Sequence, residues 1–120
     1  MTQIEKFEAV TGMSIEAMKE EAAKLSTVTT TTPVLQALKA RIADHFSTIP
    51  QTFEAIDAEL SSMGFVMTGE AKTNLWHNNK NLARFESLHR SNPFEIKAWR
   101  AMFKGTSGRY GGMMYYTFMN

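Results

Sequence analysis

The sequence predicts a mainly helical α+β domain of about four helices, closed by a short two-stranded β piece and preceded by a helical N-terminal arm. Hydrophobic residues recur at helical spacing through residues 33–63, and a capping residue or a glycine stands at the ends of each run. Segments 65–68 and 113–119 are rich in aromatic and β-prone residues instead, which favours strands. With 120 residues, of which 43% are hydrophobic, the chain is long enough to bury one core.

Two short helices are expected at the N-terminus. Thr2 and Glu5 have the spacing of a capping box, and Gly12 can end the first helix. Ser14 can cap the second helix. That second helix carries a narrow apolar seam, made of Ile15, Met18, Ala22 and Leu25.

A threonine-rich stretch without helical periodicity follows this seam. We therefore divide the chain into a helical arm at 1–26, a linker at 27–32 and a globular domain at 33–120. Because the seam is too narrow to face a large core, the helix either packs on the helical pair at 33–63 or pairs with another chain. We expect Ile15, Met18 and Leu25 to contact a protein partner or a second copy of the chain. The arm is thus a candidate for homo-oligomer formation.

Two central helices are predicted next. Pro33 suits the first position of one helix, and Thr48 with Gln51 gives a capping box for the other, which Gly64 ends. The two apolar stripes consist of Val34, Leu35, Leu38, Ile42, His45 and Phe46, and of Phe53, Ile56, Leu60 and Met63. We expect His45 to be a core or boundary residue.

A further helix is predicted at 93–104. Asn92 has the place of an N-cap, with Pro93 at the first helical position and Glu95 completing a capping box. On this helix three basic residues fall within one arc, namely Lys97, Arg100 and Lys104. A glycine-rich loop at 105–112 leads to the terminal strand, which we expect to pair with residues 65–68. This order of elements gives a topology that resembles a winged helix.

The basic arc predicts contacts with phosphates, because Lys and Arg supply most of the affinity for nucleic acid. Arg109 in the glycine-rich loop would extend the arc. A second cluster of polar and aromatic residues has the side-chain types that contact bases, and it consists of Trp76, Asn78, Asn79 and Lys80. The sequence therefore predicts a small, non-enzymatic nucleic-acid-binding protein.

Charge supports this prediction and also leaves an alternative. Residues 1–63 carry five bases and nine acids, whereas residues 64–120 carry eight bases and three acids. Such a split points to a polyanionic or acidic partner for the C-terminal half. The alternative is a protein–protein interaction module (an inhibitor, adaptor or assembly component) that acts through the arm or through the aromatic, methionine-rich C-terminus.

Several other classes are not favoured. Without any cysteine, the chain has neither a disulfide nor a thiolate zinc site, and its three histidines have no metal-ligand spacing. We expect no cofactor, no bound metal and no catalytic activity, since no nucleophile or phosphate-loop motif is present. No apolar run approaches the length of a membrane span, so we expect a cytoplasmic protein, in its own cell or in a host cell.

Overall fold

The fold comes from a computed structural model, which describes residues 2–24, 33–73, 83–88, 92–104 and 108–119. At positions 72–73, 87, 101–104 and 108–110 it describes the backbone but not the side chain. Four helices precede four strands: α1 (Gln3–Thr11), α2 (Ile15–Lys24), α3 (Pro33–Phe46), α4 (Phe53–Ser62), β1 (Phe65–Thr73), β2 (Ala83–Leu88), β3 (Glu95–Lys104) and β4 (Gly108–Phe118).

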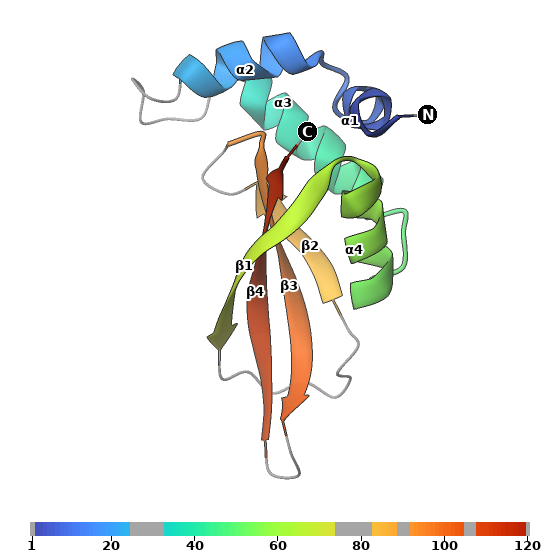
Figure 1. The fold of residues 1–120 in the computed structure, drawn as a ribbon, viewed down its shortest axis with the longest axis vertical. Helices are drawn as coiled ribbons and strands as arrows, with labels where there is room; N and C mark the ends of the chain where they lie inside the picture. The colour runs from blue at the N-terminus through green and yellow to red at the C-terminus, as the bar shows by residue number, and fades with distance from the viewer. Residues whose placement is uncertain (1, 25–32, 74–82, 89–91, 105–107, 120) are drawn as a thin grey trace.

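The strands form one antiparallel sheet in the order β1-β4-β3-β2. Helices α3 and α4 pack on one face of this sheet, and α1 packs on α3. Figure 1 shows the helices gathered around one end and one side of the sheet, while the β3–β4 hairpin projects beyond them. The molecule is accordingly elongated, with principal extents of 48 × 34 × 22 Å.

The predicted fold class is wrong, because the β part is a four-stranded sheet and the structure has no winged-helix-like arrangement among its described residues. The main error concerns residues 93–104, which form strand β3 rather than a helix. Asn92 does act on the following backbone, but its side chain and carbonyl accept from the N–H groups of Phe94 and Glu95, which makes a turn. Ile96 and Ala98 are buried and Lys97 between them is partly exposed, as in a strand.

Pairing on both sides explains why β3 is extended. Its backbone is hydrogen-bonded to β2 on one side and to β4 on the other. A central strand satisfies its backbone groups and buries side chains at once, and this outweighs the stabilisation by a helix cap, which is about 0.5–2 kcal/mol. The predicted glycine-rich loop is also strand in part, since Gly108 to Gly112 belong to β4.

Most local helix signals are confirmed. Thr2 and Glu5 form a reciprocal capping box on α1, and Gly12 ends this helix with a left-handed φ of 74°. Helix α3 begins at Pro33 as predicted. The predicted pairing of the terminal strand with residues 65–68 is confirmed as well, since Phe65 pairs with Phe118.

The predicted capping box of the fourth helix is wrong. Thr52 is the N-cap of α4, and its side chain accepts a hydrogen bond from the N–H of Ala55. Thr48 donates its hydroxyl to the carbonyl of His45 instead, at the end of α3. The residues between Thr48 and Thr52 therefore connect two helices rather than start one.

One core lies between the helices and the covered face of the sheet. Its aromatic part joins α1 to the start of β1 and the end of β4. Phe7 stacks on Phe118 with ring centroids 4.4 Å apart and also contacts Phe65 and Phe94. The core includes α2 through Met18, which is fully buried. Residues from the predicted arm and from the predicted globular domain thus share one core.

Candidate functional site

The predicted basic arc does not exist on a single surface, because side chains of a strand alternate between two faces. Ile96 and Ala98 are buried in the core, so they mark the face that the helices cover. Arg100 shares that face, whereas Lys97 lies on the opposite, open face of the sheet. Lys104 pairs with Gly108 at the end of β3, and its side chain lies outside the described ones.

Arg100 is engaged within the protein. Its Nη2 lies 2.6 Å from Oε2 of Glu70 on β1, and its guanidinium carbon lies 4.4 Å from the ring centroid of Phe53 on α4. Gly112 makes room for this pair, because a Cβ there would stand 3.3 Å from Cγ of Glu70. To contact a phosphate, Arg100 would have to give up an ion pair whose two side chains are each 21% exposed.

A second polar contact on the covered face connects α4 to β4. The buried hydroxyl of Tyr116 donates to Oδ1 of Asp57 over 2.8 Å. Burial raises the pKa of Tyr116 well above its usual range, and the hydrogen bond to Asp57 and the charge of that carboxylate add to the effect. Tyr116 is therefore a neutral hydrogen-bond donor that connects α4 to the sheet.

On the open face, Trp99 is buried although no described helix covers it. The guanidinium carbon of Arg84 lies 5.1 Å from the centroid of its ring, and a Cβ on Gly111 would come within 2.9 Å of Cζ2. The indole therefore lies over Gly111 and beneath Arg84, with 6% of the residue exposed. A ring covered in this way offers no stacking surface to a base.

The end of the β3–β4 hairpin is a two-stranded ribbon. The described parts of the edge strands end where Thr73 pairs with Gly111 and where Ala83 pairs with Arg100. Beyond these pairs, residues 102–104 pair with residues 108–110, and among the described residues no further strand pairs with either segment. At about 3.4 Å per residue, these three paired positions extend the ribbon by about 10 Å.

The structure reports on few of the other predicted nucleic-acid contacts. Arg109 pairs with Phe103 within the ribbon, and its side chain is not among the described ones. The remaining four contacts fall outside the described residues, and they are Trp76, Asn78, Asn79 and Lys80.

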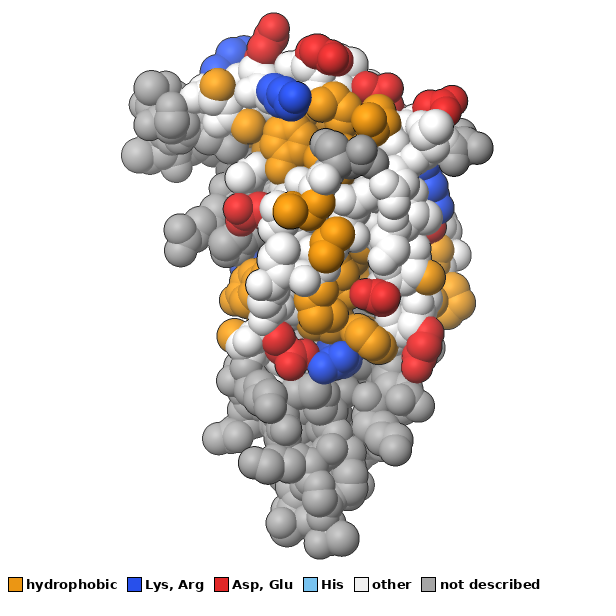
Figure 2. Space-filling model, viewed as in Figure 1, with side chains coloured by type: hydrophobic (Ala, Val, Ile, Leu, Met, Phe, Trp, Pro, Cys, Tyr) orange, Lys and Arg blue, Asp and Glu red, His pale blue; other side chains and the backbone are white. Residues whose placement is uncertain are grey.

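Charge is divided between the helices and the strands. The four helices carry five bases and nine acids, whereas the four strands carry six bases and three acids. Figure 2 shows acidic side chains spread over the helical part of the visible face. The two-stranded ribbon of residues 102–104 and 108–110 contains two bases, Lys104 and Arg109, and no acid.

The predicted partner seam is covered by the chain itself. Met18 is fully buried and Ile15 is 8% exposed, and both belong to the core. Leu25 lies outside the described residues. A partner is therefore not needed to remove these two side chains from water.

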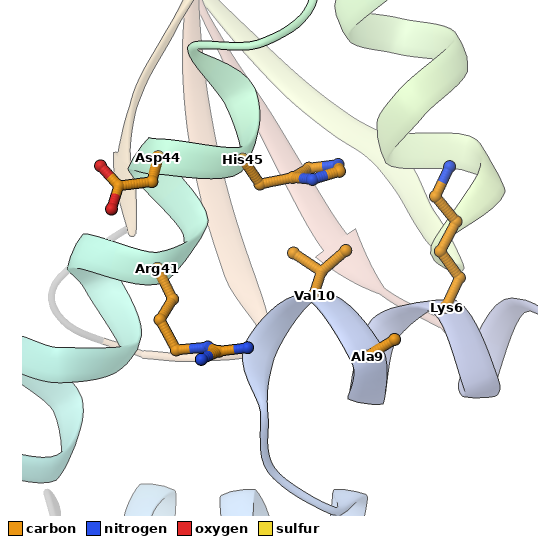
Figure 3. Close-up of a pocket in the computed structure, with 6 residues that line it drawn as sticks. All are labelled: Lys6, Ala9, Val10, Arg41, Asp44 and His45. Carbon is orange, nitrogen blue, oxygen red and sulfur yellow. The ribbon is translucent and has the colours of Figure 1, made fainter.

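A pocket between α1 and α3 was not predicted from the sequence. It has a volume of about 490 Å³ and is lined by Lys6, Ala9, Val10, Arg41, Asp44 and His45. Figure 3 shows that Arg41 and His45 extend toward Val10, whereas Asp44 points away from the other five residues. The spacing of Arg41 and His45 on one helix was visible in the sequence, but nothing there indicated that α1 lies opposite them.

Glu59 of α4 fixes one wall of this pocket. Its two carboxylate oxygens accept from Nζ of Lys6 and, over 2.6 Å, face Nε2 of His45, so one side chain connects three helices. Burial by itself would raise the pKa of Glu59, but the hydrogen bonds and charges of Lys6 and His45 outweigh it and hold the pKa below its ordinary value. Lys6 also donates to Oγ of Ser62.

Within the described ranges, no three His, Cys, Asp or Glu side chains lie close enough together to hold a metal ion. None of the described helices has both the length and the apolar character of a membrane span. Comparison with known proteins finds no family model, no curated protein and no solved structure that matches this chain.

Proposed function

We propose that this protein binds nucleic acid without catalysis, and that it does so through the basic strands of its sheet rather than through a helix. The observation that carries the proposal is the division of charge. Nine of the twelve acidic residues lie on the helices, whereas the two-stranded ribbon at the end of β3 and β4 has bases and no acids. A polyanion is attracted to a surface of this kind and is repelled by the helical one.

The shape of the ribbon supports the same proposal. A two-stranded β-ribbon fits the major groove of B-DNA, which is about 12 Å wide and about 8.5 Å deep. The ribbon of residues 102–104 and 108–110 extends past the described parts of the edge strands by a greater length than this depth, and Figure 1 shows it clear of the helices. Lys104 and Arg109 belong to it, and two bases without an acid suit a segment that would lie among phosphates.

The test is a fluorescence-anisotropy titration with single-stranded and double-stranded oligonucleotides at two salt concentrations. The double variant Lys104→Glu with Arg109→Glu should weaken binding at least about tenfold and reduce the salt dependence, because it removes phosphate contacts. The control variant Lys19→Glu with Lys39→Glu makes the same change in net charge at exposed positions of α2 and α3 and should bind as the wild type does. Equal effects of the two variants, or no binding by the wild type, would refute the proposal.

A protein–protein interaction is the second candidate, and one observation favours it. The open face of the sheet exposes 52% of Val66 on the edge strand β1, beside Thr68 and the partly exposed Thr117 and Tyr115 of β4. A face of this composition suits a protein surface better than a phosphate backbone. Its binding would change little between the two salt concentrations, whereas nucleic-acid binding would fall steeply.

A further inference from the structure

We propose that the pocket between α1 and α3 binds a small organic anion, meaning a carboxylate or phosphate group on a short apolar body, with Arg41 as the residue that recognises the charge. This site lies on the helices and is independent of nucleic-acid binding by the sheet. Its volume of about 490 Å³ is within the range of small-molecule sites, roughly 300–1,000 Å³.

The guanidinium of Arg41 is positioned by the backbone of α1. A Cβ on Gly12 would stand 2.9 Å from both Cζ and Nε of Arg41, so the guanidinium packs directly against the residue that ends α1. Gly12 has a φ of 74°, which favours glycine there in any case. The same arrangement places a positive charge at the C-terminal end of a helix dipole, which is a favourable location.

The charge of Arg41 is available to a ligand. Among the described residues, no carboxylate makes an ion pair with Arg41, whereas Lys6 and His45 both face Glu59. Figure 3 shows the side chain of Asp44 turned away from Arg41. A planar guanidinium with several N–H donors binds a carboxylate or a phosphate through two parallel hydrogen bonds.

The rest of the pocket suits an apolar body attached to that anion. Val10 and Ala9 supply its aliphatic wall, and the ring of His45 extends over the same space. Glu59 holds this ring at Nε2, so the wall is already formed before a ligand enters. An anion paired with Arg41 would therefore place its apolar part against Val10 and the imidazole.

The probes are benzoate and phenyl phosphate, with the uncharged benzamide as a matched control. Titration of the ¹⁵N-labelled full chain should shift the amide signals of Val10 and Gly12 and the Nε–H signal of Arg41, with a dissociation constant on the order of 1 mM. Comparing benzoate with phenyl phosphate identifies which oxyanion the site prefers. Benzamide should cause no saturating shift at these positions.

Two variants separate recognition by Arg41 from general surface charge. Arg41→Gln should weaken binding of the preferred anion by about tenfold or more, because the charge-assisted pair is lost. Lys39→Gln removes an exposed charge from the same helix outside the pocket and should leave binding unchanged. Both variants should retain the wild-type melting temperature, which shows that they are folded. Equal binding of benzamide, unchanged binding by Arg41→Gln, or the absence of saturating shifts in the wild type would overturn the proposal.

Discussion

Replacing Phe7 by alanine tests whether α1 is part of the core or a detachable arm. Phe7 is fully buried and its ring contacts three others, with centroids 4.4 Å from Phe118, 5.5 Å from Phe65 and 6.2 Å from Phe94. Truncating a buried phenylalanine to alanine costs about 3–5 kcal/mol, and each ring pair adds to the loss. We expect a decrease near the upper end, about 4–5 kcal/mol, against a total stability of roughly 5–15 kcal/mol for a domain.

Urea-induced unfolding followed by circular dichroism gives this free energy. Ile4→Ala is the matched control, because Ile4 lies on the same helix but is 39% exposed, and it should cost less than about 1 kcal/mol. If Phe7→Ala is too unstable to fold, Phe7→Leu leaves a smaller void and should give an intermediate loss. A cost of less than about 1 kcal/mol for Phe7→Ala, equal to that of the control, would show that residues 1–26 are indeed a separable arm.

Two further predictions concern a glycine in the sheet and the carboxylate that connects three helices. Gly111→Ala should destabilise the protein by about 1–3 kcal/mol, because its Cβ would stand 2.9 Å from the ring of Trp99 and 3.2 Å from a backbone oxygen. The control Gly69→Ala should cost clearly less in the same unfolding experiment, since the nearest atom to its Cβ would be 3.8 Å away. Similar costs for both would mean that the indole does not lie over Gly111. For Glu59, the lowered pKa means that its contribution to stability is complete above the ordinary value of 4.5 and is lost as the pH falls through the lower folded-state value. The difference in unfolding free energy between the wild type and Glu59→Gln should therefore shrink as the pH falls below about 4.5. A difference that does not change over that acidic range would contradict this assignment.

Helices were predictable from the sequence because their stabilising contacts are local. The capping box of Thr2 and Glu5, the end of α1 at Gly12 and the start of α3 at Pro33 all involve residues within one turn of one another. Strand β3 was not predictable in this way. Its cap-like residues are also local, but they produce a turn, and the hydrogen bonds that keep Ile96 and its neighbours extended come from β2 and β4.

The sequence by itself determined the helical segments, their apolar faces and the contrast in charge between the two halves of the chain. Only the tertiary structure decided which bases share a surface: it paired Arg100 with Glu70, separated it from Lys97 and brought Arg41 against Gly12. The physical reason is the range of the interactions. A helix closes its hydrogen bonds four residues away, whereas a strand takes its hydrogen bonds from other strands, and its pleat turns every second side chain to the other face of the sheet.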